Sequence, residues 1–324
     1  MTFAKKALIV GSLAVFAASG AASARERLNA SGATFPENIY SRWFSQLAKS
    51  GGPKVNYQGI GSGGGRKAFI DETVSFAASD DPIKAKDKAK VSRGVVQIPT
   101  VGGTIAIGYN KPGCTLKLTQ KQAVSIFMGS IRDWKELGCA AGQISVVRRS
   151  DGSGTTAAFA DSMQAFSKEW TLGTAKTLNW KVGVGGKGNE GVAALISSTP
   201  GAIGYVNQSF VKGAIKAAAV QNKAGQFVLP SFKSGQAALS GITVDADLAG
   251  GNPNPSASGA YPIATLTYLL VYRTGNGSKT DAIKATVNYM LSDKAQAQAG
   301  ALGFVPLSEG LQAKAKAAVN KIRK

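Results

Sequence analysis

The fold of this chain is decided around the stretch Arg148-Arg149-Ser150-Asp151-Gly152-Ser153-Gly154-Thr155-Thr156. This stretch joins a short apolar run, 144–147, to a segment of helical character, 157–170. The pattern predicts a strand, a glycine turn and the first turn of a helix, where backbone N–H groups without intrahelical partners attract an anion. Arg149 adds a planar set of N–H donors at the same place. The stretch therefore predicts a site for a phosphate-like oxyanion on an α/β scaffold.

A single glycine turn of this kind also fits a well-capped connection between a strand and a helix, with Arg149 as an ordinary surface residue. The pattern recurs, however. Thr34 and Phe35 precede a helical segment, 37–47, whose first turn contains Pro36. This second helix start again offers small polar groups, which favours the anion-site interpretation.

A third helix start follows the strand-like segment 54–59, in a glycine loop that contains Ser62. The helical segment 66–72 comes next, and a further strand-like segment ends at Asp80. Strand, helix and strand in this order predict a βαβ unit, and ligands of open α/β sheets bind at the carboxyl ends of the strands. Ser62 and Asp80 are therefore candidate site residues, although Asp80 alone also fits an ordinary residue at a strand end.

Residues 1–24 have the pattern of a secretory signal peptide. Lys5 and Lys6 precede an apolar run that is too short for a membrane span, and Ala22-Ser23-Ala24 fits a cleavage site. The roughly 300 residues that remain are enough for two lobes. We expect a soluble, exported protein whose mature chain begins near Arg25.

The chain is strongly basic. Its formal net charge is +20, and removal of the two leader lysines leaves +18. Such a charge favours anionic partners through long-range attraction. Export argues against nucleic acid, and the lysines are scattered rather than interleaved with aromatic residues. We expect no nucleic-acid partner and interpret most of the lysines as a solvated face.

The chain has two cysteines and no histidine. In an exported protein Cys114 and Cys139 are disulfide candidates, and such a bond stabilises by about 3 kcal/mol; free thiols are the alternative. The absence of histidine excludes Ser-His-Asp and Cys-His catalysis and histidine-based metal sites. We expect neither an enzyme nor a cofactor or metal.

The middle and the end of the chain predict a connection between two lobes. Two apolar segments, 95–99 and 104–109, predict strands that cross from one lobe to the other, and the Gly, Pro, Asn and Ser residues of 249–260 predict a boundary loop. A strand over 261–272 then returns the chain to the first lobe. Two helical segments close that lobe, 279–291 and 309–324.

Five segments together resemble the periplasmic phosphate-binding proteins of ABC-type phosphate uptake systems. In chain order they are 32–36, 56–62, 78–80, 147–155 and 185–189. The resemblance spans most of the mature chain. It implies an α/β, two-lobed periplasmic binding protein of the Venus-flytrap, class II-like type, with a hinge of crossing strands. The expected lobes are 25–103 plus 261–324 for lobe I and 104–260 for lobe II.

The resemblance also implies a function and a ligand set. A member of this family binds inorganic phosphate tightly outside the cytoplasmic membrane, as a periplasmic monomer, and delivers it to the membrane subunits of an ABC permease. Carried across to this sequence, the phosphate ligands are Thr34, the backbone N–H of Phe35, Ser62, Asp80, Arg149, Ser153, the backbone of Gly154, and Thr155. Asp151 would hold Arg149 in place through an ion pair.

Asp80 is the exception in this set of hydrogen-bond donors. An ionised carboxylate only accepts, so it needs a ligand that still carries a proton. HPO₄²⁻ and H₂PO₄⁻ meet this need, whereas sulfate does not and is disfavoured by several kcal/mol. Two residues depart from the family pattern: Gly63 stands where a second serine is common, and Asp81 stands where a small residue is usual.

Other functions fit parts of the pattern. The segment 59–64 matches the dinucleotide fingerprint G-x-G-x-x-G, and Asp80 follows about 20 residues further on, as in NAD-binding oxidoreductases. Export, the lack of histidine and the second anion site around Arg149 argue against an oxidoreductase. A P-loop fails because glycine follows Lys187, so the loop 183–189 is interpreted as a structural turn. Two alternatives stay open: a broader oxyanion receptor for arsenate or sulfate, and a basic surface or adhesion protein.

Overall fold

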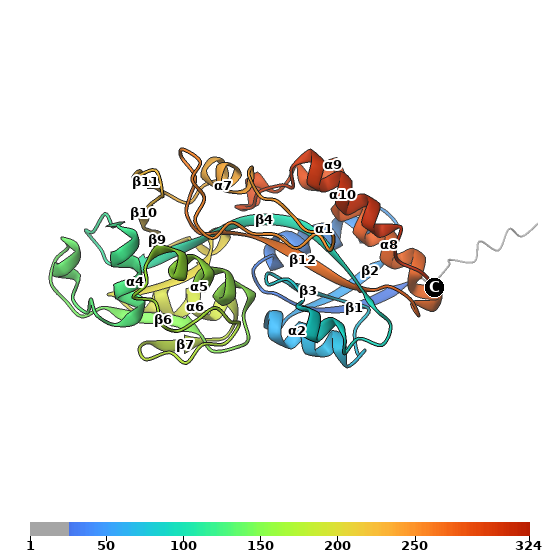
Figure 1. Ribbon diagram of the computed structural model, residues 1–324, viewed down its shortest axis with the longest axis horizontal. Coiled ribbons are helices and arrows are strands. Elements are labelled where there is room, and N and C mark those ends of the chain that lie inside the picture. The colour runs from blue at the N-terminus through green and yellow to red at the C-terminus, as the bar shows by residue number, and fades with distance from the viewer. Residues whose placement is uncertain (1–25) are drawn as a thin grey trace, which may run out of the picture.

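The computed structural model describes residues 26–324 and shows an elongated α/β molecule with two lobes (Figure 1). The predicted signal peptide, 1–24, lies outside the described residues. The lobes share one nine-stranded sheet with the order β2-β1-β3-β12-β4-β8-β6-β7, to which β9 is added through β4. The predicted α/β class with two lobes is confirmed. None of the helices in 26–324 has the length and apolar character to cross a membrane.

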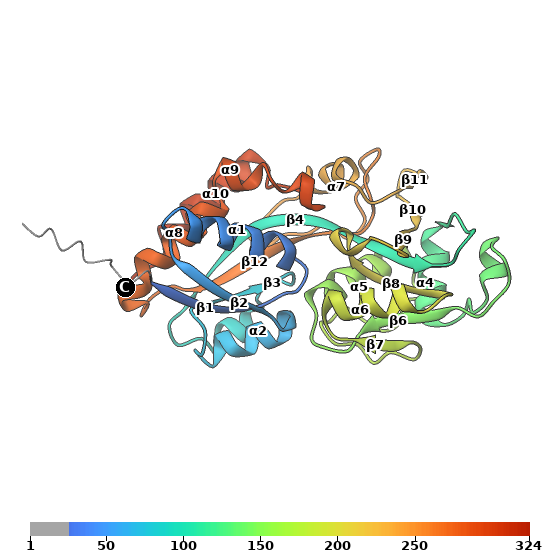
Figure 2. The same cartoon turned by 180° about the vertical axis from the view of Figure 1, so that it is seen from behind.

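Strand β4 (Val95–Asn110) joins the lobes. Its first part, 95–104, pairs antiparallel with β12 (Ala264–Tyr272), and its second part, 105–110, pairs antiparallel with β8 (Ala202–Asn207). The prediction of two separate strands here is wrong, because one strand runs unbroken through both lobes. Figure 2 shows β4 passing across the molecule from one lobe to the other.

Lobe I is built on parallel strands β1, β2 and β3, with β12 and the first part of β4 antiparallel to them. Helix α2 covers one face of this sheet, and α1, α8 and α10 cover the other (Figures 1 and 2). The elements are β1 (Arg27–Gly32), α1 (Glu37–Lys49), β2 (Lys54–Gly59), α2 (Gly61–Ile70), β3 (Phe76–Ser79), α3 (Ala85–Lys88), η3 (Gly277–Lys279), α8 (Thr280–Met290), α9 (Asp293–Gln296), η4 (Gly300–Leu302) and α10 (Glu309–Val319).

Lobe II is built on the second part of β4 with β8, β6 and β7. Residues of α5 and α6 pack against opposite faces of these strands, since Phe159 lies in the cluster of Ile203 and Tyr205, and Ile196 in that of Val206. The elements are β5 (Lys117–Leu118), α4 (Gln120–Met128), η1 (Trp134–Leu137), β6 (Ser145–Arg149), α5 (Gly154–Phe166), β7 (Val184–Gly186), α6 (Gly188–Ser198), η2 (Gln208–Phe210), β9 (Lys216–Ala217), β10 (Ala219–Gln221), β11 (Phe227–Val228) and α7 (Phe232–Leu239).

Helix α1 shows how the sequence produces this packing. Its apolar residues recur at helical spacing, and all of them are buried against the lobe I sheet and its neighbours: Ile39, Tyr40, Trp43, Phe44 and Leu47. Burial of one such large apolar side chain stabilises by roughly 1.5–3 kcal/mol. The outer face of the helix is polar, so only one rotation of α1 about its axis buries the apolar face against the sheet.

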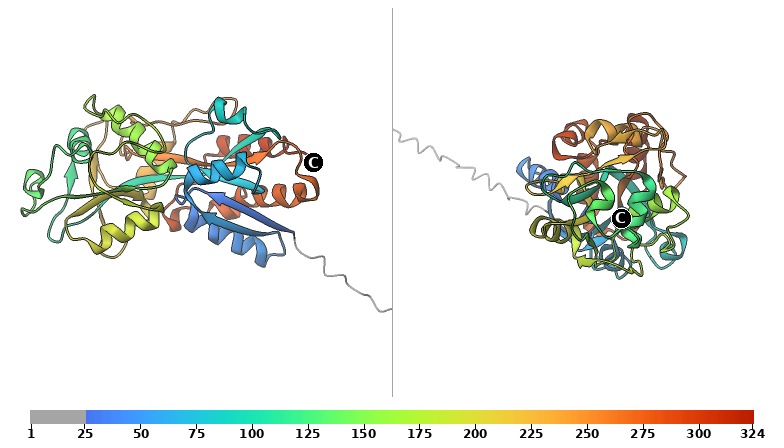
Figure 3. Two further views of the ribbon diagram at one scale, coloured as in Figure 1. Left: turned by 90° about the horizontal axis from the view of Figure 1, so that it is seen from below. Right: turned by 90° about the vertical axis from the view of Figure 1, so that its left-hand side faces the viewer.

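The loops at the junction follow from strand direction. The first described residues lie at the far end of lobe I, beside the C-terminus, and β1 runs from there toward the junction (Figures 2 and 3). Because β2 and β3 are parallel to β1, their carboxyl ends meet at the same edge. The fold therefore places the loops after β1, β2 and β3 against lobe II.

Cys114 and Cys139 form a disulfide in lobe II, as predicted. Because this bond closes a loop of 25 residues, we expect the Cys114→Ser/Cys139→Ser variant to lose about 3 kcal/mol in the free energy of unfolding. Urea unfolding of the variant and of the oxidised parent measures the loss. Reduction of the parent should lower its midpoint to that of the variant, and equal midpoints for oxidised parent and variant would contradict the prediction.

Candidate functional site

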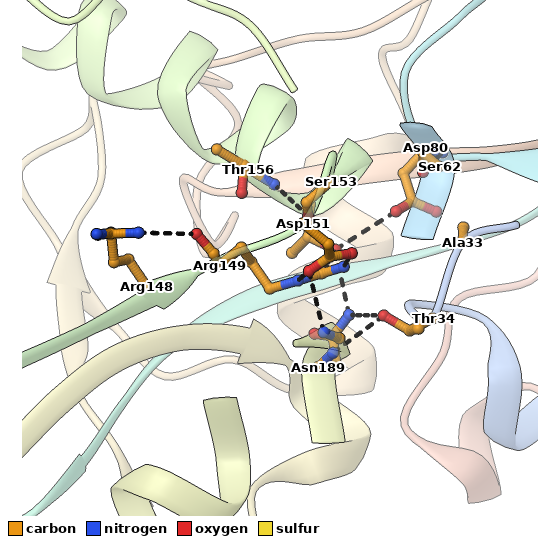
Figure 4. Close-up of polar contacts among 12 residues, drawn as sticks. Ala33, Thr34, Ser62, Asp80, Arg148, Arg149, Asp151, Ser153, Thr156 and Asn189 are labelled. Carbon is orange, nitrogen blue, oxygen red and sulfur yellow. Dashed lines mark hydrogen bonds and ion pairs between the residues drawn. The ribbon is translucent and has the colours of Figure 1, made fainter. Parts of the chain in front are cut away.

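The predicted site residues meet at the junction of the lobes (Figure 4). Loops and the start of α2 in lobe I bring Thr34, Phe35, Ser62 and Asp80 to this place, and β6 with the start of α5 brings Arg149, Asp151, Ser153, Gly154 and Thr155. Hydrogen bonds cross between the two groups. The side chain of Thr155 donates to Asp80 Oδ2 at 3.4 Å, and the N–H of Gly63 donates to the carbonyl oxygen of Gly152 at 2.7 Å.

Thr34 and Phe35 occupy the turn between β1 and α1. Thr34 is buried, and its hydroxyl oxygen accepts hydrogen bonds from the backbone N–H and from Nδ2 of Asn189, both at 3.0 Å. The buried ring of Phe35 packs edge-on against Phe304, with ring centroids 6.0 Å apart. This packing anchors the turn, so that its backbone and the Thr34 hydroxyl keep their place at the junction.

Ser62 lies at the start of α2, next to Asp80. Its hydroxyl oxygen accepts a hydrogen bond from the backbone N–H of Asp80 at 3.3 Å. The preceding residue, Gly61, has a φ of +82°, which glycine adopts without the steric cost of a side chain. The bond uses one lone pair of the Ser62 oxygen, and the hydroxyl proton stays available for a ligand.

Asp80 is buried at the end of β3, with 3% of its surface exposed. Its Oδ1 accepts a hydrogen bond from the hydroxyl of Thr267 on β12. Burial raises the pKa of Asp80 to about 7, although the Thr267 hydrogen bond and the charge of Arg149 act in the opposite direction. Asp80 is therefore an acceptor among side chains that mostly donate, and its raised pKa means that it also takes up a proton readily near neutral pH.

Arg149 ends β6 and is held by a two-pronged ion pair. Its Nε lies 2.7 Å from Asp151 Oδ1 and its Nη2 lies 2.5 Å from Asp151 Oδ2, while Nη1 lies 3.5 Å from the Thr155 hydroxyl. Burial would raise the pKa of Asp151, but the Arg149 hydrogen bonds and charge hold it below its ordinary value. A guanidinium has five N–H bonds, so one on each terminal nitrogen of Arg149 remains to donate to an anion.

Ser153 caps helix α5, and Gly154 begins it. The Ser153 oxygen accepts a hydrogen bond from the N–H of Thr156 at 3.0 Å, which leaves the hydroxyl proton to donate elsewhere. A Cβ atom at Gly154 would lie 2.5 Å from the Ser62 hydroxyl and 2.7 Å from the Asp80 nitrogen, so the approach of the lobes requires glycine here. The N–H groups of the first turn of α5 have no partners within the helix.

The charges of the site nearly cancel. Arg149 and Asp151 form a neutral pair, and Asp80 adds at most one negative charge. An anion here must be held by hydrogen-bond donors and helix N-termini rather than by excess positive charge. Within 26–324 no group of three or more Cys, Asp or Glu residues is placed to hold a metal ion.

Two residues of the site are not in the predicted set. Asn189, at the start of α6, donates to both Thr34 and Thr155 through Nδ2, and Thr267 donates to Asp80 from β12. The interpretation of the loop 183–189 as a structural turn missed Asn189. Its sequence signal was the same one that identified Thr155, namely a glycine loop that leads into a helix. For Thr267 no local signal existed, because it lies inside a strand.

Known proteins resemble this chain in sequence and fold. A family model described as a PBP superfamily domain matches residues 17–294. The phosphate-binding protein PstS of Pasteurella multocida is 35% identical over 325 residues, covering 94% of this chain and 92% of the relative. PstS of Haemophilus influenzae is 36% identical over 299 residues, covering 86% and 88%. Among solved structures, a high affinity periplasmic phosphate-binding protein bound with phosphate superposes with a TM-score of 0.78 at 24% identity. The match covers 90% of this chain and 93% of that chain, so the two share a fold.

Proposed function

From the premise that this chain belongs to the family of phosphate-binding proteins within the periplasmic-binding-protein superfamily, we propose that it is the phosphate receptor of an ABC uptake system. It encloses one inorganic phosphate between its lobes in the periplasm and delivers it to the membrane subunits of a permease. The observation that carries this proposal is the convergence of Arg149 and two helix starts on Asp80, a buried acceptor.

Phosphate matches the donors and the acceptor of this junction. Its unprotonated oxygens can accept from Arg149, from the hydroxyls of Thr34, Ser62, Ser153 and Thr155, and from the backbone N–H groups of Phe35 and Gly154. Its P–O–H group can donate to Asp80. Desolvation of an anion is offset only when many such hydrogen bonds replace water, and this set provides them.

Closure of the lobes buries the ligand. We take lobe I as 25–103 plus 261–324 and lobe II as 104–260, with the boundary inside β4, so that bending of β4 and of the segment that enters β12 opens and closes the junction. The relatives are named as binding proteins, and we propose a monomer without catalytic activity or cofactor. The disulfide suits a periplasmic location, where oxidation is permitted.

An ion pair between the lobes should slow release of the ligand. Lys176 Nζ of lobe II lies 3.2 Å from Asp81 Oδ2 of lobe I, and the Lys176 carbonyl oxygen accepts from the N–H of Ser153. We expect Lys176→Met to raise the phosphate dissociation rate by about 3-fold to 10-fold, since a partly buried pair of this kind contributes roughly 1 kcal/mol. Stopped-flow release measures the rate. Lys181→Met, at an exposed lysine of the same lobe, is the control, and identical rates for both variants would exclude a role for the pair.

Calorimetric titration tests the proposed function. The mature protein is freed of ligand by partial unfolding and refolding, then titrated with phosphate and with sulfate near pH 8.5, where Asp80 is ionised, at low and at high NaCl concentration. We expect one-to-one phosphate binding that is much tighter than sulfate binding and changes little with salt, because a buried site is weakly screened. Absence of phosphate binding would reject the proposal.

Two other functions have support from particular observations. A broader oxyanion receptor is favoured by the pKa of Asp80 near 7, because a protonated carboxyl group can donate to sulfate. A basic surface protein is favoured by a groove of about 850 Å³ beside α1 that is lined by Arg42, Lys49 and Lys212. Anion binding in that open groove would collapse with added salt, so the titration above separates it from the buried site.

A further inference from the structure

We infer that Asn189 is a positioning residue that turns two threonine hydroxyls into obligate donors toward the bound anion, an inference that rests on the proposed function. Asn189 is fully buried near the start of α6, in lobe II. Figure 4 shows it facing Thr34, from the other lobe, below Arg149. Its contacts thus reach both sides of the junction.

The orientation of the Asn189 amide is fixed by a backbone group. The N–H of Asn207 donates to Asn189 Oδ1 at 2.8 Å. An N–H group has no lone pair, so the oxygen of the amide, and not its nitrogen, must face Asn207. Nδ2 with its two N–H bonds therefore faces Thr34 and Thr155, at 3.0 Å and 3.2 Å from their hydroxyl oxygens.

The count of hydrogen bonds then decides what Thr34 can do. A hydroxyl oxygen accepts two hydrogen bonds and donates one. Thr34 Oγ1 accepts from the backbone N–H and from Nδ2 of Asn189, both at 3.0 Å, which fills both acceptor positions. The Thr34 hydroxyl is left with only its proton, and that proton is available to an anion.

Both acceptor positions of the Thr155 hydroxyl oxygen are occupied as well. Thr155 Oγ1 accepts from Asn189 Nδ2 at 3.2 Å and from Arg149 Nη1 at 3.5 Å. Its proton is directed to Asp80 Oδ2 at 3.4 Å, and it turns to the anion when the P–O–H group occupies that carboxylate oxygen. With the lone pairs of both threonines occupied, neither hydroxyl can take the proton of a P–O–H group. Of Thr34, Thr155 and Asp80, only Asp80 can accept it, so Asn189 also supports the discrimination that depends on Asp80.

A double-mutant cycle with Thr34 tests this role. We expect Asn189→Ala to weaken phosphate binding by about 10-fold to 100-fold, the range for lost hydrogen bonds to charged groups. In the Thr34→Val background the same substitution should cost at least about 5-fold less, because the hydroxyl that Asn189 orients is gone. The readout is the phosphate dissociation constant of the four proteins, measured by calorimetry near pH 8.

Two further variants separate positioning from folding. Asn189→Asp preserves shape but replaces the two N–H donors by an acceptor, so it should weaken phosphate binding more than Asn189→Ala does; a residue that only fills space would give the opposite order. Asn222→Ala removes another buried asparagine, whose Nδ2 donates to the Ala260 carbonyl oxygen away from the site. It should lower the melting temperature and leave phosphate affinity unchanged.

The outcomes are distinct. Coupling between positions 34 and 189, together with the expected order of Ala and Asp, supports the inference. Additive losses, or an Asn189→Ala variant that binds phosphate as the parent does, overturn it and leave the proposed function intact. Failure of the parent itself to bind phosphate overturns the proposed function, and the inference falls with it.

Discussion

Exchange of Arg149 for methionine lowers phosphate affinity by about three orders of magnitude in our account, the largest effect of any single side chain. Two N–H groups of Arg149 are free to donate to the anion, and each hydrogen bond between charged groups contributes roughly 1.5–3 kcal/mol. The substitution also leaves Asp151 without its partner, with only 13% of its side chain exposed, so that a negative charge faces the ligand. Calorimetric titration of the variant measures the loss.

The neighbouring arginine provides the control for Arg149. The Arg148 side chain points away from the junction, and its Nη1 donates to the carbonyl oxygen of Arg149 (Figure 4). Arg148→Met removes the same charge and should leave phosphate affinity within about 3-fold of the parent, since the half-buried Arg148 guanidinium donates away from the anion. Arg149→Lys keeps the charge but loses the planar fork, and an intermediate loss is expected. Equal affinities for Arg148→Met and Arg149→Met would contradict the assigned role.

Exchange of Asp80 for asparagine should collapse the preference for phosphate over sulfate by at least about 100-fold. The side chain of asparagine can donate to a sulfate oxygen, whereas the carboxylate of Asp80 repels it and offers no proton. The Thr267 hydroxyl donates to the amide oxygen of this asparagine, so the amide nitrogen faces the ligand and the P–O–H group of phosphate loses its acceptor in the same variant. Titrations with both anions near pH 8.5, where Asp80 of the parent is ionised, give the ratio. Asp161→Asn, on α5 outside the predicted ligand set, is the matched control, and an unchanged ratio in Asp80→Asn would remove Asp80 from the selectivity mechanism.

The pH dependence of the parent follows from the same carboxyl group. Burial raises the pKa of Asp80 to about 7 in the ligand-free protein, and Asp81 nearby acts in the same direction. Below this pH the protonated group can donate to sulfate, so sulfate affinity should increase as pH falls from 8.5 to about 6, but not in Asp80→Asn.

The folded chain also keeps a proton that the unfolded chain releases near pH 4. The contribution of this group to unfolding free energy therefore declines as pH rises from about 4 to about 7.

The crossing strands show where sequence patterns mislead about the fold. Pro99, Gly102 and Gly103 divide 95–110 into two apolar segments, and the sequence therefore predicts a break. In the structure β4 continues because the register shifts opposite Thr267 and Tyr268, where Pro99 and Val101 face consecutive residues of β12. Thr100 is the extra residue of this bulge, and a bulge tolerates the adjacent Pro99, which has no N–H group to donate. Pairing with a strand more than 150 residues away is not visible in local sequence.

The candidate site was more accessible to prediction than its supports. Thr34, Ser62, Asp80 and Thr155 stand beside helix starts or strand ends, and such positions carry a local signature that the sequence shows directly. Thr267 sits within a strand and Asn189 follows a loop that also fits a simple turn. Their roles depend on hydrogen bonds to residues far away in the chain, from Thr267 to Asp80 within lobe I and from Asn189 to Thr34 across the junction.

The most direct test of the account is a crystal structure of the mature protein grown with phosphate and without sulfate. We expect one tetrahedral anion between the lobes, within hydrogen-bond distance of Arg149, Ser153 and Thr155 on one side and of Thr34, Ser62 and Asp80 on the other. An anion found only in the groove lined by Arg42, Lys49 and Lys212, with none at the junction, would contradict it.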